Sequence, residues 1–290
     1  MSISKQTVST GHADIAVVES SGTGLPVLLI HGNSSCKEVF RGLYEGPLGE
    51  IYRMIAMDLP GHGESSRAFN PERSYTLPGY AAAAVEVLEG LGIKQAAVYG
   101  WSLGGYVALE MVPQYGGLVG LMISGAPPVR PTPESIQGGY RPLPQIGLLG
   151  KPDLSEEEIA MLAGGTYGAA CNEMLTEAVR RTDGRARAVM FGSLFQGGFS
   201  DLRALVETSG TPLAVVDGAD DPFVNVEYVG SLNYASLWDE HCYTLRGAAH
   251  VPFLQTPEAF SAIFGRFLGD MEKRVSEGKS RVRSTKAVAA

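Results

Sequence analysis

The sequence predicts an α/β protein with a mostly parallel sheet and helices on both faces. Short apolar runs, typical of strands buried on both faces, occur at 27–30, 53–57, 96–99 and 118–124. Apolar residues at helical spacing lie between them, most clearly at 80–91. This alternation of strands and helices favours parallel strands joined by crossover helices.

Weaker signals complete the expected sheet and its helical layers. Four further strands, making eight in all, are expected at 6–10, 14–18, 213–216 and 242–245, and further helices at 37–48, 103–112 and 257–268.

The strand pattern stops between Pro127 and about Leu205. This stretch is rich in Pro and Gly and then helical in patches, with a capping box from Ser155 to Glu158. We therefore expect a helical cap inserted into an α/β core. The predicted divisions are a core of 1–126 and 206–270, a cap of 127–205, and a basic, disordered tail of 271–290.

Composition narrows the classes of partner. The 290 residues are 44% hydrophobic and carry a net charge of −8, which argues against nucleic acid or an anionic membrane as the main partner. No apolar run approaches the roughly 18 residues of a membrane span, and no secretory signal is visible. The three scattered cysteines indicate free thiols in a reducing compartment, so we expect a cytoplasmic protein. The oligomeric state stays open.

The run at 100–104, Gly-Trp-Ser-Leu-Gly, places Ser102 between a predicted strand and a predicted helix. Such a turn forces strained backbone angles on the serine and lifts its hydroxyl off the sheet. Gly100 and Gly104 leave room where a Cβ would collide with neighbouring elements. Ser102 is therefore the candidate nucleophile, and the N–H of Leu103 is a candidate oxyanion donor.

Two candidate partners follow later strands, in the order serine, acid, histidine. Asp221 follows the strand at 213–216, and His250 follows the strand at 242–245. The carboxyl ends of parallel strands meet at one edge of the sheet, so these side chains are expected to converge on Ser102. Asp220 is a second claimant for the acid, but we assign the role to Asp221 and expect Asp220 to brace the turn.

A second oxyanion donor is expected from the loop after the strand at 27–30. Gly32 permits a close backbone approach, and the N–H of Asn33 would face the pocket. His31 lies at a strand end and His62 lies in the tight loop after the strand at 53–57; both are predicted to brace their loops rather than to react. The five histidines show no spacing of a metal site, so we expect no metal and no cofactor.

Five motifs in this order resemble those of the α/β-hydrolase superfamily, over about residues 6–270. They are His31-Gly32-Asn33, Asp58 to Gly63, Gly100 to Gly105, Gly218 to Pro222, and Gly247 to His250.

A narrower resemblance is to the N-acyl homoserine lactonases of α/β-hydrolase fold, carried also by 181–187 in the predicted cap. It implies Ser102 as nucleophile, His250 as base, Asp221 as acid, and Asn33 and Leu103 as oxyanion donors. Two positions depart from that family.

The first departure is Asp221, which stands where the lactonases have Glu. The second is Leu162, which stands in place of a cap tyrosine near the lactone. Tyr167 or Tyr140 can replace the lost hydroxyl.

The sequence thus predicts a metal-independent serine hydrolase that opens the lactone ring of N-acyl homoserine lactones, a small-molecule substrate with an apolar acyl chain. Alternatives are a carboxylesterase of open-chain esters, a cofactor-free perhydrolase, and a non-catalytic receptor on a hydrolase fold.

Overall fold

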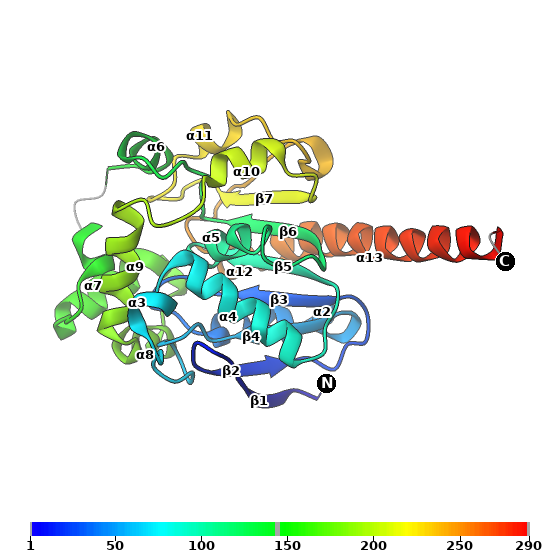
Figure 1. Ribbon diagram of the computed structural model, residues 1–290. Helices are drawn as coiled ribbons and strands as arrows, with labels where there is room; N and C mark the ends of the chain where they lie inside the picture. The colour runs from blue at the N-terminus through cyan, green and yellow to red at the C-terminus, as the bar shows by residue number, and fades with distance from the viewer. Residues whose placement is uncertain (1, 143–145, 289–290) are drawn as a thin grey trace.

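The computed structural model describes residues 2–142 and 146–288, with side chains up to residue 277, as one sheet flanked by helices (Figure 1). The strands are β1 Ser4–Ser9, β2 Asp14–Glu19, β3 Pro26–Ile30, β4 Arg53–Met57, β5 Ala96–Trp101, β6 Leu118–Ser124, β7 Leu213–Gly218 and β8 Tyr243–Leu245. They form an eight-stranded sheet in the order β1-β2-β4-β3-β5-β6-β7-β8. β2 pairs antiparallel with both β1 and β4, and all the other neighbouring strands pair parallel, which confirms the predicted fold.

Helices cover both faces of this sheet. Outside the segment between β6 and β7 they are η1 Lys37–Phe40, α1 Arg41–Tyr44, α2 Pro47–Ile51, α3 Pro71–Ser74, α4 Leu77–Gly90, α5 Leu103–Glu110, α11 Val226–Gly230, η4 Trp238–Glu240, α12 Pro252–Gln255 and α13 Pro257–Val288. Between β6 and β7 lie α6 Pro133–Gly139, η2 Ile146–Gly150, α7 Glu156–Tyr167, η3 Gly168–Ala170, α8 Glu173–Arg181, α9 Gly184–Phe195 and α10 Leu202–Thr208.

Successive residues of β3 point to opposite layers, as the pleat of a strand requires. Leu28 belongs to the same buried cluster as Tyr80 of α4 and Val107 of α5. Leu29 belongs to the opposite cluster, which contains Phe260 of α13. The sheet is therefore buried on both faces, and only the ends of its strands are free to form a site.

Two helices differ from the prediction because of local chain chemistry. The helix expected at 37–48 is divided into η1, α1 and α2, since Gly46 and Pro47 end one helix and begin the next. The helix expected at 80–91 begins at Leu77, because the side chain of Thr76 accepts a hydrogen bond from the N–H of Gly79 and caps the first turn.

The C-terminal tail was predicted to be disordered, and for the described residues this expectation is wrong. α13 continues to Val288, and Figure 1 shows its last part extending away from the sheet. Met271 is buried, and Glu272 Oε1 accepts a hydrogen bond from the N–H of Leu25 at 3.0 Å. The packed part of α13 thus passes the expected boundary, and a run without proline allows the helix to continue.

Candidate active site

Ser102 occupies the turn between β5 and α5 with φ 55° and ψ −121°, a backbone conformation that L-residues rarely adopt. Its N–H donates to the carbonyl of Ser124 at 2.7 Å, which ties the turn to β6. A Cβ added to Gly100 would lie 2.1 Å from the carbonyl oxygen of Gly104, and one added to Gly104 would lie 2.0 Å from that of Ile30. Gly100 therefore allows the start of α5 to lie against β5, and Gly104 allows the turn to pack against β3.

Three side chains form a hydrogen-bonded row at the carboxyl edge of the sheet. His250 Nε2 lies 3.0 Å from Ser102 Oγ, and His250 Nδ1 lies 2.8 Å from Asp221 Oδ2. Asp221 and His250 are almost fully buried. The sequence separates these residues by 29 and 148 positions, and the fold brings together the three that were predicted to meet.

Asp221, rather than Asp220, reaches the histidine. Its other oxygen, Oδ1, accepts hydrogen bonds from the N–H groups of Phe223 at 2.8 Å and Val224 at 3.1 Å. Burial alone would raise the pKa of this carboxyl, but the His250 ring and these donors outweigh it and lower the pKa below its usual value. Asp220 is exposed and donates its N–H to the carbonyl of Ala248. It braces the turn, as expected.

The loop after β3 lies directly against the serine. A Cβ on Gly32 would come within 2.9 Å of the Trp101 ring and 3.1 Å of Ser102 Cβ, so only glycine allows this approach. His31 Nδ1 donates to the carbonyl of Gly32 at 2.7 Å, and its Nε2 accepts from the N–H of Leu59 at 3.0 Å.

These contacts orient the peptide between Gly32 and Asn33. In a trans peptide the N–H points opposite to the C=O, so His31 directs the Asn33 N–H away from itself. Burial lowers the pKa of His31 to about 4, which keeps the ring neutral. His31 therefore braces the loop, as predicted. Leu103 is the first residue of α5, where a main-chain N–H has no partner within the helix.

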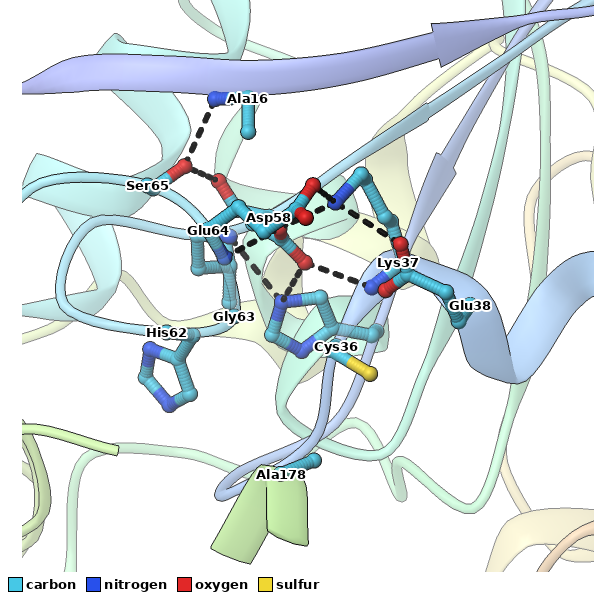
Figure 2. A network of polar contacts seen from close by, with 12 residues as sticks. Ala16, Cys36, Lys37, Glu38, Asp58, His62, Gly63, Glu64, Ser65 and Ala178 are labelled. Carbon is cyan, nitrogen blue, oxygen red and sulfur yellow. Dashed lines mark hydrogen bonds and ion pairs between the residues drawn. The ribbon is translucent and has the colours of Figure 1, made fainter. Parts of the chain in front are cut away.

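A buried ion-pair network joins the loops after β3 and β4 (Figure 2). Lys37 Nζ contacts Asp58 Oδ2 at 2.8 Å and Glu64 Oε2 at 2.7 Å, and the N–H of Lys37 donates to Asp58 Oδ1. Ser65 Oγ donates to the carbonyl of Asp58 and accepts from the N–H of Ala16, as Figure 2 shows. Removing one partner of such a buried pair is costly, so the network holds both loops in place.

His62 lies in the second of these loops. Its Nδ1 donates to the carbonyl of Pro60 at 3.1 Å, and burial lowers its pKa to about 3. This histidine is structural, as the sequence predicted.

Ser102 and His250 open onto a cavity of about 850 Å³, part of which is open to solvent. Asn33 also lines it, and its side-chain amide donates to the carbonyl of Leu149 in η2 at 3.0 Å. Most of the wall is apolar, and about half of the residues that line it come from the segment between β6 and β7. Its members include Ile136, Ile146, Leu149, Met190, Phe191 and Leu194.

The tyrosines considered as substitutes for a hydroxyl at Leu162 lie in different surroundings. Tyr140 lines the cavity. Tyr167 is buried, with its ring centroid 5.8 Å from that of Trp101. Leu162 is buried in a hydrophobic cluster. Within the described part of the chain, neither Tyr167 nor Leu162 is among the residues that line the cavity.

Sequence reasoning missed three residues that position His250. The indole Nε1 of Trp101 donates to the carbonyl of His250 at 2.7 Å, and the Phe223 ring lies 4.6 Å from the imidazole, centroid to centroid. A Cβ on Gly125, whose φ is +65°, would come within 2.8 Å of the same ring. Trp101 directly precedes Ser102 and Phe223 lies two residues after Asp221, and this proximity in the chain was the only available signal.

Among the residues that the structure describes, no group of three or more His, Cys, Asp or Glu side chains is arranged to hold a metal ion. No described helix is both long enough and apolar enough to cross a membrane.

The sequence and the fold of this chain are similar to those of known proteins. A model of the alpha/beta hydrolase family matches residues 27–263. The chain belongs to the alpha/beta hydrolase family. The match spans both the core and the helices between β6 and β7.

This chain is similar to the solved structure of an N-acyl homoserine lactonase, AidH, in complex with N-butanoyl homoserine. The identity is 41%, the TM-score is 0.90, and the match covers 92% of this chain and 97% of that one. A pimeloyl-[acyl-carrier protein] methyl ester esterase of Methylococcus capsulatus is 28% identical, over 87% of this chain and 97% of its own. The esterase RhEst1 from Rhodococcus sp. ECU1013, with 23% identity, TM-score 0.76 and coverage of 93% and 100%, shares the fold. These relatives support a hydrolase of esters or lactones.

Proposed function

We propose that this hydrolase opens the lactone ring of N-acyl homoserine lactones through Ser102, His250 and Asp221. The observation that carries the choice of substrate is the 41% identity to an N-acyl homoserine lactonase over 92% of the chain. The hydrogen-bonded row of three side chains at the foot of an apolar cavity supports the mechanism.

The reaction begins with attack of Ser102 Oγ on the ring carbonyl carbon. The hydroxyl proton passes to His250 Nε2, 3.0 Å away, and Asp221 stabilises the imidazolium and keeps the ring oriented. The oxyanion accepts hydrogen bonds from the N–H groups of Asn33 and Leu103, and such a donor is worth about 10²–10³ in rate.

Collapse of this intermediate breaks the bond between the carbonyl carbon and the ring oxygen. The ring oxygen takes the proton from His250 and becomes a tethered alcohol, which leaves an ester on Ser102. Water then attacks that ester while His250 accepts its proton. The products are the ring-opened N-acyl homoserine and the free Ser102 hydroxyl.

The apolar wall of the cavity provides room for an acyl chain. Each buried methylene group contributes about 0.8 kcal/mol, so chain length should change the affinity until the cavity is filled. An enzyme of this kind would remove acyl homoserine lactone signals, that is, carry out quorum quenching. The free cysteines Cys36, Cys171 and Cys242 agree with a cytoplasmic location.

The test compares hydrolysis of N-acyl homoserine lactones of graded chain length with that of linear esters of the same acyl groups. We expect a higher kcat/KM on the lactones. A preference for the linear esters would instead support a carboxylesterase, the second candidate, which the similarity to pimeloyl methyl ester esterases favours. Binding without turnover of either class would indicate a receptor.

A further inference from the structure

Two tyrosine hydroxyls meet at the wall of the cavity. Tyr106 lies one helical turn after Ser102 on α5, and Tyr140 follows α6. Their hydroxyl oxygens are 2.5 Å apart, and both residues line the cavity that contains Ser102 and His250. The function described above assigns no role to this pair.

The hydrogen atoms of the pair can be assigned from their partners. The carbonyl of Pro127 is only an acceptor, and Tyr106 Oη lies 3.0 Å from it, so Tyr106 donates its single hydrogen there. Tyr106 Oη must then accept from Tyr140, because its own hydrogen is already used. The hydroxyl of Tyr140 thus has no hydrogen left for a ligand and can only accept.

Main-chain contacts hold Tyr140 beside the catalytic end of the cavity. Tyr140 forms a β-bridge with Val224, and the N–H of Arg141 donates to the carbonyl of Phe223 at 2.8 Å. The ring of Phe223 lies 4.6 Å from that of His250, centroid to centroid. Tyr140 therefore lines the same cavity as His250, on the side formed by Phe223.

We infer that Tyr140 Oη is a specificity-determining acceptor that takes a hydrogen bond from the amide N–H of the substrate. The inference rests on the proposed function and extends it to one atom of the substrate. In an N-acyl homoserine lactone the amide nitrogen is bonded to the carbon next to the ring carbonyl, so the N–H enters the site with the reacting bond. A bound ligand without this donor covers the tyrosine acceptor and leaves it unpaired, which weakens its binding.

The experiment compares two lactones in two enzymes. One substrate is N-hexanoyl homoserine lactone, and the other is its ketone analogue, in which CH₂ replaces the amide N–H. The enzymes are the wild type and Tyr140→Phe, which keeps the ring and removes the acceptor. Tyr228→Phe is the matched control, because its hydroxyl donates to the neighbouring carbonyl of Pro128 at 2.9 Å, yet the residue is not among those that line the cavity.

We expect the wild type to prefer the amide over the ketone in kcat/KM by about 5- to 10-fold, the effect of one hydrogen bond. Tyr140→Phe should reduce this preference to about 2-fold or less, mainly by slowing the amide, and Tyr228→Phe should leave it unchanged. An equal preference in wild type and Tyr140→Phe would overturn the inference while the proposed function stands.

Failure of the proposed function has a different signature. In that case the wild type opens neither lactone. The methyl esters N-hexanoylglycine methyl ester and methyl 4-oxononanoate then make the same N–H against CH₂ comparison without a ring. A Tyr140-dependent preference for the first ester would retain the acceptor role, and its absence would overturn it.

Discussion

The indole of Trp101 donates a hydrogen bond to the main-chain carbonyl of His250, with Nε1 and O separated by 2.7 Å. This contact links the residue before Ser102 to His250, which accepts the serine proton in the proposed mechanism. It is a second connection between β5 and the loop that carries His250, in addition to the 3.0 Å contact between Ser102 and His250 themselves.

Replacing Trp101 with Phe should therefore lower kcat by about fivefold, since one hydrogen bond of about 1 kcal/mol no longer positions His250. The other tryptophan provides a matched control. Trp238 Nε1 donates to Asp270 Oδ2 at 3.1 Å, so Trp238→Phe loses a similar bond. Equal effects of the two substitutions on kcat would contradict the positioning role of Trp101. Thermal unfolding of both variants measures the accompanying loss of stability.

Gly32→Ala should nearly abolish activity, because its Cβ would lie 2.9 Å from the Trp101 ring and 3.1 Å from Ser102 Cβ and would displace the loop that carries Asn33. We expect a loss of at least about 100-fold in kcat, the effect of one oxyanion donor. Gly42→Ala is the control, because nothing lies within 4 Å of the new Cβ in helix α1. It should leave kcat unchanged and stabilise the fold by about 0.5–1 kcal/mol. Similar kinetics for both variants would argue against a close approach of Gly32 to Ser102.

The acid is tested by Asp221→Asn. An amide in this position offers the wrong hydrogen-bonding group to His250 Nδ1 and disfavours the reactive tautomer, so kcat should fall by about 10⁴-fold with little change in KM. Asp220→Asn, at an exposed neighbour, should stay within about twofold of wild type. Comparable losses of kcat in the two variants would contradict the assignment of Asp221, rather than Asp220, as the acid.

The fold was predictable from the periodicity of apolar residues. The convergence of Ser102, Asp221 and His250 was predictable from their order in the chain, because each follows a predicted strand. Buried strands are recognisable as short apolar runs. A parallel sheet then brings the carboxyl ends of β5 and β7 and the segment after β8 to one edge. Gly32 and Gly100 were found for a related reason, since close backbone approaches favour glycine.

Other contacts between distant segments, which no motif marks, were not predictable. The hydrogen bonds from Trp101 to His250 and between Tyr106 and Tyr140 join positions 149 and 34 residues apart. No periodic pattern marks such pairs. The end of α13 was missed for another reason, because a charged segment without an apolar stripe also describes a solvated helix.

Asp217 introduces a pH dependence of stability. It is buried on β7, accepts a hydrogen bond from the N–H of Gly125 at 2.7 Å, and lies near Asp221 and His250; burial raises its pKa to about 7. Because this pKa exceeds the unfolded value of about 3.8, the folded state binds the proton more tightly. The stabilisation is complete below pH 4 and is lost as the pH rises through 7.

Asp217→Asn removes the ionisation while keeping the oxygen that accepts from Gly125. The melting temperature of the variant relative to wild type should therefore increase steadily between pH 4 and pH 8. Thermal melts across this range measure the difference. A difference that does not vary with pH would show that Asp217 does not titrate in this window.

The most direct test of the account is hydrolysis of N-hexanoyl homoserine lactone by wild type and Ser102→Ala, with EDTA present in both assays. We predict ring opening by the wild type that EDTA does not reduce, and a fall of about 10⁶-fold in kcat in the variant. Wild-type activity lost on chelation, or retained by Ser102→Ala, would contradict a serine mechanism.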